Sequence, residues 1–152
     1  MRALASRVLS SESSLLVLGP VGTGKTRLAA AIVRESIRWG VRPTMYLVRT
    51  LFRRIWATYR DGARETEDQV IDHLTTAEVL VLDDISHEGR PSDAVISVLH
   101  EILTIRIGFG RPTVVTTNLT LEEIGRHYRE SIRSRLGSWP TLVMRGRDWR
   151  GA

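Results

Sequence analysis

Short apolar runs alternate with amphipathic segments along the whole chain. The runs are continuously apolar or β-branched and do not alternate with polar residues, which is typical of strands buried on both faces of a sheet. The predicted strands are Leu15–Leu18, Thr44–Val48, Val79–Leu82, Thr113–Thr117 and Thr141–Met144.

The segments between these runs carry apolar residues at the spacing of a helix. One helix is expected after Thr120, where Glu123 completes a capping box, and another after Pro91, with an apolar stripe from Val95 to Leu103. The other predicted helices are Met1–Ser10, Lys25–Trp39, Leu51–Tyr59, Glu65–Leu74 and Glu130–Leu136. Strands that alternate with helices predict an α/β protein, in which a parallel sheet carries helices on both faces.

The composition agrees with one soluble domain spanning residues 1–152. Hydrophobic residues make up 42% of the chain and charged residues 26%, which is close to the average for globular proteins. The absence of cysteine excludes disulfides, a thiol nucleophile and a thiolate zinc site, and it fits a reducing, cytoplasmic environment. No apolar run approaches the roughly 18 residues of a membrane helix, no signal peptide is recognisable, and the four histidines lack metal-ligand spacing.

The balance of charge points to an anionic partner. The formal net charge is +5, from 22 basic and 17 acidic residues. Lys25 is the single lysine, so every other basic residue is arginine. A chain that uses arginine for its general surface cations has a specific need for an ammonium group at position 25.

A phosphate-binding motif surrounds this lysine. Residues 19–26 match G-x-x-x-x-G-K-[ST] between a predicted strand and a predicted helix, the context that the motif requires. The glycines allow backbone N–H groups to surround a phosphate, and the helix N-terminus adds its positive dipole. We expect Lys25 to reach the β- and γ-phosphates and the Thr26 hydroxyl to ligate Mg²⁺. The predicted phosphate-binding residues are Gly19, Pro20, Val21, Gly22, Thr23, Gly24, Lys25 and Thr26.

Polar residues follow two further predicted strands. Asp83 and Asp84 come at the end of Val79–Leu82, and ligands of open α/β sheets bind outside that end of the strands. Asp83 is expected to hold the Mg²⁺ shell, and Asp84 to orient or deprotonate the attacking water; the alternative is a turn that caps the next segment. A side chain of residues 116–118 could bond the γ-phosphate or the water, or only begin the turn before Thr120.

In this order and spacing, these motifs resemble those of the AAA+ ATPases, a class of P-loop NTPases with an ASCE core. Within that class the chain is most similar to the DnaC/DnaI-type helicase loaders and the related IstB transposition helpers. The resemblance covers nearly the whole chain, and its more specific parts are Asp83-Asp84, Pro112–Asn118, Ser134-Arg135-Leu136 and Gly146–Arg150. It implies a five-stranded parallel sheet with the strand order 5-1-4-3-2.

The resemblance also implies roles for three further residues. Asn118 is similar to the sensor-1 residue, and Arg150 to a sensor-2 residue that contacts the nucleotide. Arg135 matches the arginine finger, which acts on ATP bound to the neighbouring subunit, with Arg133 as a competitor. The alternative for Arg135 is an ion pair on the surface of a helix.

The partners that the resemblance implies are single-stranded DNA, a replicative helicase or a transposase, and further copies of the chain in a ring or spiral. Helicase loaders usually carry an N-terminal region that binds the helicase. Here only 18 residues precede the P-loop, so no such domain is recognisable. The expected function is therefore an ATP-hydrolysing, DnaC-like helicase loader, with an IstB-like transposition helper as the alternative.

One segment mixes arginines with aromatic residues. Single-strand binders use this mixture because arginines contact phosphates and rings stack on bases. Phe52, Ile55, Trp56 and Tyr59 share one side of a helix, so the alternative is an ordinary amphipathic helix with its rings in the core. In the related loaders the same stretch contacts single-stranded DNA. The candidate DNA-binding residues are Arg49, Arg53, Arg54, Trp56 and Arg60.

Two functions of other classes remain open. A small P-loop kinase has the same phosphate loop and parallel sheet, but it also needs a substrate pocket and a mobile, arginine-rich lid. Residues 116–118 and 134–136 argue against it. A nucleotide-binding switch with little hydrolysis would depend on Lys25 and tolerate the loss of Asp84.

Overall fold

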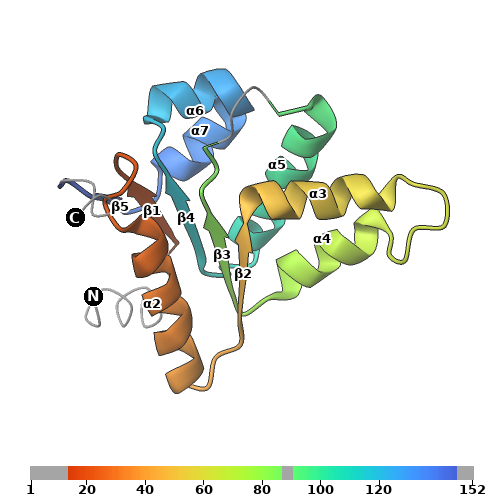
Figure 1. Ribbon diagram of the computed structural model, residues 1–152, viewed down its shortest axis with the longest axis horizontal. Coiled ribbons are helices and arrows are strands. Elements are labelled where there is room, and N and C mark those ends of the chain that lie inside the picture. Colours follow the sequence, from red (N-terminus) through yellow and green to blue (C-terminus); the bar gives the residue numbers. More distant parts are fainter. Residues whose placement is uncertain (1–13, 87–90, 147–152) are drawn as a thin grey trace.

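The structure is a computed structural model, and it describes residues 14–86 and 91–146. Its centre is a parallel sheet of five strands in the order β2-β3-β4-β1-β5 (Figure 1). The α/β class and the predicted order 5-1-4-3-2, which is the same order counted from the other edge, are confirmed. The strands are β1 (Leu15–Leu18), β2 (Pro43–Leu47), β3 (Val79–Asp83), β4 (Thr113–Thr117) and β5 (Thr141–Val143).

Six helices connect and follow these strands within the described residues. They are α2 (Lys25–Arg38), α3 (Val48–Thr58), α4 (Glu67–Thr76), α5 (Asp93–Gly108), α6 (Leu121–Tyr128) and α7 (Glu130–Gly137). The predicted helix Met1–Ser10 lies outside the described residues. No helix of the described part of the chain combines the length and apolar character of a membrane span.

Most bounds lie within one residue of the sequence prediction, and the starts of two helices differ more. The second strand and the following helix are contiguous, because buried Val48 begins α3 directly after β2. The next helix was expected from Glu65, but Thr66 caps α4 and forms a capping box with Gln69. The Thr120–Glu123 capping box of α6 is present as predicted.

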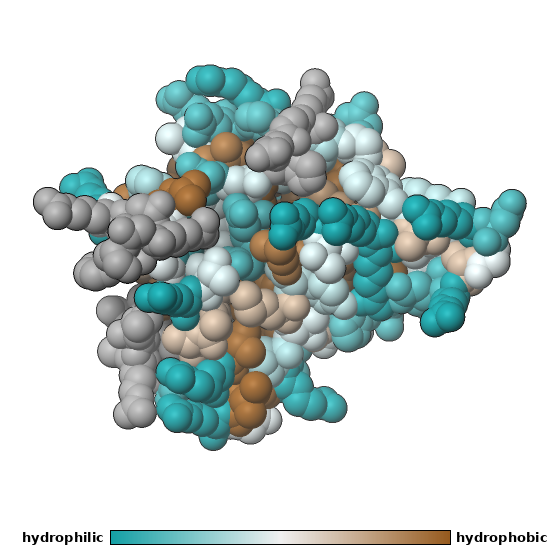
Figure 2. All heavy atoms as spheres, viewed as in Figure 1, coloured by the Kyte–Doolittle hydropathy of each residue, from teal (hydrophilic) through white to brown (hydrophobic). Residues whose placement is uncertain are grey.

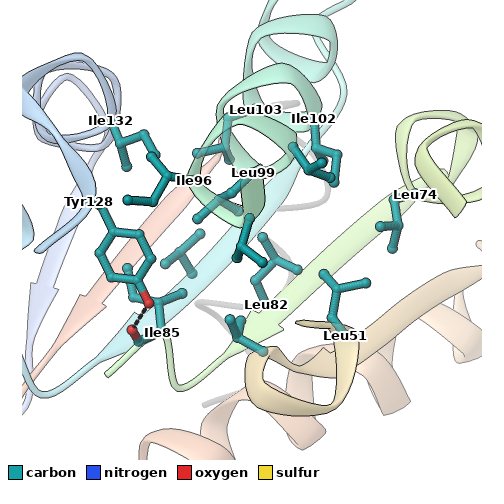
Figure 3. Packing of buried hydrophobic residues seen from close by; sticks show 14 of the residues in the cluster. Leu51, Leu74, Leu82, Ile85, Ile96, Leu99, Ile102, Leu103, Tyr128 and Ile132 are labelled. Atoms are coloured by element: carbon teal, nitrogen blue, oxygen red, sulfur yellow. Dashed lines mark hydrogen bonds between the residues drawn. The ribbon is translucent and has the colours of Figure 1, made fainter. Parts of the chain in front are cut away.

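The two faces of the sheet are covered unequally. Leu15, Val17, Val79, Val81 and Val114 point to one face, where α2 packs over them. The intervening strand residues point to the other face and join a larger cluster with α3 to α7, part of which is seen in Figure 3. The three central strands β1, β3 and β4 are buried on both faces, whereas the edge strands β2 and β5 are half-buried and largely exposed.

Parallel pairing brings the carboxyl ends of the strands to one edge of the sheet. Leu18 of β1 pairs with Thr117 of β4, and Leu82 of β3 pairs with Val115 of β4. The phosphate loop after β1, the aspartates of β3 and the polar end of β4 therefore lie next to one another.

A buried arginine binds the backbone at the opposite end of the strands, where β3 and β4 begin. Arg106 of α5 is fully buried, and burial together with Arg111 lowers its pKa to about 10. Its guanidinium donates hydrogen bonds of 2.7–3.2 Å to Thr113 Oγ1 and to the carbonyl oxygens of Leu74, Thr75, Ala77 and Pro112. These bonds fix the end of α4 and the starts of β3 and β4.

We expect Arg106→Leu to lower the free energy of unfolding by about 3 kcal/mol or more, because several buried acceptors lose their donor. Urea denaturation measures the change. Arg38→Leu is the control: Arg38 is half-exposed in the last turn of α2 and pairs with Glu35, so its loss is expected to cost about 0.5 kcal/mol or less. Similar losses for the two variants would contradict this role of Arg106.

Candidate functional site

The phosphate loop connects β1 to the first turn of α2. Gly24 stands at the N-cap of α2 with φ 92°, a conformation that favours glycine, and no side chain caps the helix. The first turn of α2 also has no acidic residue. No side chain of the described residues therefore competes with an anion for the start of the helix or opposes its dipole, as the motif predicts.

Close packing requires glycine at position 19, which the sequence did not reveal. A Cβ added at this position would lie 2.5 Å from the carbonyl oxygen of Met144. The Met144 N–H donates to Leu18 O at 2.7 Å, and the Gly19 N–H to Thr117 O at 3.2 Å. Gly19 therefore allows the loop to leave the sheet between its two neighbouring strands.

Lys25 points into the curve of this loop. Its side chain is 9% exposed, and Nζ donates to Gly19 O at 2.7 Å and to Pro20 O at 2.8 Å. The Thr23 hydroxyl donates to the same Pro20 carbonyl at 2.8 Å. The ammonium group thus lies against the first two residues of the loop, where phosphate oxygens could replace the two carbonyl oxygens as acceptors.

The two aspartates after β3 have different environments. Asp83 is 2% exposed, and its Oδ1 accepts a hydrogen bond of 2.6 Å from the Thr116 hydroxyl. Asp84 is exposed, has φ 58°, and donates its backbone N–H to the same hydroxyl at 2.9 Å. Thr116 therefore fixes both residues, which is a role distinct from the phosphate or water contact expected of residues 116–118.

A second set of hydroxyl contacts lies beside this one. Ser86 Oγ and Thr117 Oγ1 are 2.9 Å apart, and the Asn118 N–H donates to Ser86 Oγ at 2.7 Å. The Asn118 side chain is left exposed. Ser86 was missed by the sequence analysis, since a lone serine beyond a strand carries no pattern.

These residues surround a cleft of about 590 Å³, a volume typical of ligand sites. Its lining residues are Val21, Gly22, Gly24, Lys25, Thr26, Arg27, Asp84, Ser86, Thr116 and Asn118. The cleft thus joins the phosphate loop to the ends of β3 and β4. Arg27 and Ser86 were not predicted. Asp83 lies behind Thr116 and is not one of the lining residues.

The candidate arginine fingers lie on α7, and neither lines the cleft. Arg133 is bound to the Glu130 carboxylate through Nε at 2.7 Å. Arg135 donates to Ser131 O of its own helix at 3.2 Å. On α5, burial lowers the pKa of His100, and the positive charges of Arg135 and Arg129 lower it further. Arg150 lies outside the described residues.

The arginine-aromatic segment is α3 and the turn after it, and it is divided between the core and the surface. Phe52 and Ile55 are buried, whereas Trp56 is 42% and Tyr59 53% exposed. The alternative, an ordinary amphipathic helix with its rings in the core, is therefore wrong for Trp56 and Tyr59. α3 and α4 extend beyond the edge strand β2 (Figure 1), and hydrophilic side chains gather over α3 (Figure 2).

Four exposed residues form what we call the α3 stripe: Arg49, Arg53, Trp56 and Arg60. They follow one another at four, three and four positions, so they lie along one side of the helix and its C-terminal extension. Arg54 faces away from them. It binds Glu65 at 2.6 and 2.7 Å and also Tyr46, and its guanidinium lowers the pKa of Glu65.

Two known replicative helicase loaders are similar to this chain in sequence. The replicative helicase loader DnaC of Escherichia coli K12 is 29% identical over 128 residues, covering 83% of this chain and 51% of DnaC. The replicative helicase loader DnaI of Bacillus subtilis is 28% identical over 119 residues, covering 78% of this chain and 37% of DnaI. The chain thus spans about half, or less, of the length of these relatives.

Solved structures show the same fold. A crystal structure of DnaI superimposes with a TM-score of 0.80 at 24% identity and covers 97% of this chain and 81% of that one. AMPPCP-bound DnaA from Aquifex aeolicus superimposes with a TM-score of 0.83 at 16% identity, over 93% of this chain and 44% of that one. The fold is that of the P-loop AAA+ proteins.

The family assignment rests on the sequence. A family model described as IstB-like ATP binding protein matches residues 2–133, which include the phosphate loop, both aspartates and the polar end of β4. The resemblance to helicase loaders and IstB helpers is confirmed. The chain belongs to the family of IstB-like ATP-binding proteins.

Proposed function

We propose that this protein is a Mg²⁺-dependent ATPase that assembles on single-stranded DNA and loads a replicative helicase. The observation that carries the proposal is the cleft, which places the phosphate loop opposite Asp84 and Asn118. One cleft then holds groups for binding phosphate, for orienting water and for sensing the γ-phosphate.

Each group has a role that follows from its position. Lys25 neutralises the β- and γ-phosphates, while the N–H groups at the start of α2 bind the remaining oxygens. Asp84 is exposed to the cleft, and its carboxylate orients the attacking water or accepts its proton. Asn118, which follows β4 between the phosphate loop and Asp84, bonds the γ-phosphate or that water.

The residues present fit a magnesium ion. The Thr26 hydroxyl lines the cleft, and the Asp83 carboxylate, held by Thr116, lies at the end of the neighbouring strand. A hydroxyl, a carboxylate and nucleotide oxygens are the donors that Mg²⁺ prefers, and Asp83 suits a contact through a bound water. The ion would neutralise charge on the β- and γ-oxygens during transfer.

Arg135 completes the site of a neighbouring copy. Its position on α7, away from its own cleft, suits an arginine that neutralises transition-state charge in trans. Arg133 is the weaker candidate, because its guanidinium already binds the Glu130 carboxylate. Hydrolysis would then depend on assembly.

The test of this function is the steady-state rate of ATP turnover per subunit. We expect it to rise with protein concentration and with single-stranded DNA, and to stop when Mg²⁺ is chelated. A rate that is measurable but independent of concentration and DNA would contradict assembly. Turnover that requires a small-molecule acceptor would instead indicate a kinase.

Helicase loading is favoured by the relatives that match over most of this chain, DnaC and DnaI. The match to the IstB-like family model favours a second candidate, a transposition helper with the same ATPase cycle and a transposase as partner. Pull-down with purified replicative helicase, with and without ATP, distinguishes the two.

The α3 stripe is the proposed DNA surface. Replacing Arg49 and Arg53 by serine should weaken binding to labelled oligo(dT). It should also make the slope of log K against log salt concentration shallower by roughly 0.7 for each lost phosphate contact. Trp56→Ala should weaken binding by about 1–3 kcal/mol, because one stacking platform is lost. Fluorescence anisotropy at several salt concentrations measures both effects.

The control for the α3 stripe is Arg34→Ala, which removes an exposed arginine from α2. Its binding to oligo(dT) should stay within about twofold of the original, since surface charges away from the contact act only through the general field. Equal losses in the control and the stripe variants would mean that the overall charge, and not this surface, binds DNA.

A further inference from the structure

One buried hydrogen bond joins the aspartate segment to the corner between α6 and α7. The Tyr128 hydroxyl, at the end of α6, donates to the carbonyl oxygen of Ile85 (Figure 3). Tyr128 is fully buried and Ile85 is 1% exposed. Ile85 directly follows Asp84, and Tyr128 directly precedes the short corner that begins α7.

The backbone is unusual on both sides of this bond. Among the described residues, the only non-glycine residues with positive φ are Asp84, at 58°, and Arg129, at 103°. Aspartate tolerates this region, but the conformation of Arg129, with ψ 152°, costs about 1–3 kcal/mol and persists only when its surroundings hold it. The two exceptional residues are therefore the neighbours of the two hydrogen-bond partners.

The aspartate segment is held from two sides. From β4, the Thr116 hydroxyl accepts the Asp84 N–H, and the Thr116 carbonyl accepts the Ile85 N–H at 3.0 Å. From α6, the phenol of Tyr128 binds the Ile85 carbonyl. Burial and the negative charge of Asp84 both raise the pKa of Tyr128, which agrees with a phenol close to that carboxylate.

The corner at Arg129 is also held by several hydrogen bonds. The Arg129 N–H donates to Gly125 O at 3.1 Å, and its guanidinium binds Asp93 at 3.0 Å. Its carbonyl accepts the N–H groups of Ile132 and Arg133 in the first turn of α7. Tyr128, the corner and α7 therefore form one connected unit, and α7 carries Arg135.

We infer that Tyr128 is a positioning residue that couples Asp84 of one subunit to α7 of the same subunit. The inference rests on the proposed function. Asp84 serves the subunit's own nucleotide, whereas Arg135 serves the neighbour's. The Tyr128–Ile85 bond thus links the state of one site to the arginine offered to the next, so that neighbouring subunits do not hydrolyse ATP independently.

The test removes only the phenol oxygen. In Tyr128→Phe the ring still fills its place in the core, but the Ile85 carbonyl loses its donor. We expect kcat to fall about tenfold, equivalent to about 1.4 kcal/mol, while the Kd for AMPPCP changes less than about twofold. Tyr46→Phe is the control, since it removes a half-buried phenol from β2 that is bound by Arg54.

A second readout does not depend on hydrolysis. Hydrogen exchange is measured for α2 and α7 with and without AMPPCP. In the original protein, AMPPCP should protect both helices; in Tyr128→Phe, protection should remain at α2 and be lost at α7. An unchanged α7 response in the variant, or no α7 response in the original protein, would overturn the coupling.

The two readouts separate the two proposals. If the original protein binds AMPPCP without turning over ATP, the proposed ATPase fails, and hydrogen exchange still decides the role of Tyr128. If Tyr128 is merely structural, urea stability falls while kcat of the folded variant and the α7 response stay unchanged. That result would overturn the inference and leave the ATPase standing.

Discussion

Arg135→Ala should reduce ATP turnover by about 10³-fold or more and leave the affinity for ATP nearly unchanged. An arginine finger contributes a factor of this order because its charge meets the transferring phosphoryl group only in the transition state. Arg135 does not line the cleft of its own subunit, so we expect its loss to leave the binding of that subunit's nucleotide nearly unchanged. Steady-state kinetics give kcat, and a titration with AMPPCP gives the Kd.

Arg133→Ala is the matched control for this prediction, because it removes an arginine two positions earlier on the same helix. Arg133 binds Glu130 in a surface pair, which is worth about 1 kcal/mol or less, so turnover should change little. If Arg133→Ala loses turnover and Arg135→Ala keeps it, the finger has been assigned to the wrong residue.

Lys25→Ala should weaken ATP binding about 100-fold. Nζ makes two hydrogen bonds to loop carbonyls, at 2.7 and 2.8 Å, and the proposed exchange for two phosphate oxygens replaces both neutral acceptors by charged ones. Two such bonds are worth about 3 kcal/mol together, which corresponds to this factor. Isothermal titration with ATP and Mg²⁺ measures the loss.

The same loss should not occur when an outward-facing cation of the same helix is removed. Arg34→Ala takes one positive charge from α2 and leaves the phosphate loop intact, so its affinity for ATP should stay within about twofold. An affinity of Lys25→Ala equal to that of the control would mean that ATP binds elsewhere.

Much of the fold was predictable from local pattern. The strands Leu15–Leu18 and Thr113–Thr117 have the predicted bounds, because apolar runs between turn residues leave few alternatives. The phosphate loop was equally clear, since glycine spacing, a following helix and the single lysine point to the same structure. Where parallel strands end at one edge, the meeting of the loop with Asp84 and Asn118 follows from topology.

The hydrogen bonds that fix the aspartates and Asn118 in place were not predictable in the same way. The Thr116 bonds to Asp83 and Asp84 and the Ser86–Thr117 contact join residues more than 30 positions apart. They depend on the register of β3 against β4, which no local pattern encodes. One signal was available for Arg106: it continues the apolar stripe of α5, where a charged residue has to be bound in the core.

The α3 segment shows the limit of helical periodicity. The spacing placed Trp56 and Tyr59 with the buried side, yet both are exposed near the end of a helix that extends beyond the sheet. Whether a ring is buried depends on how far the neighbouring elements reach. The contacts between neighbouring elements also decide that Arg54 pairs with Glu65 while Arg53 stays exposed.

Mixing two inactive variants tests most directly whether the ATP site is shared between subunits. When ATP is kept well below the raised Kd of Lys25→Ala, that variant retains its arginine finger but leaves its own site empty, whereas Arg135→Ala binds ATP but lacks the finger. In an equimolar mixture, about a quarter of the head-to-tail interfaces pair an intact loop with an intact finger. We predict turnover well above the sum of the two variants, with that fraction of the original rate as its upper bound, because coupling between neighbouring sites lowers it further. A mixture no more active than the sum of its two components would contradict a finger acting in trans.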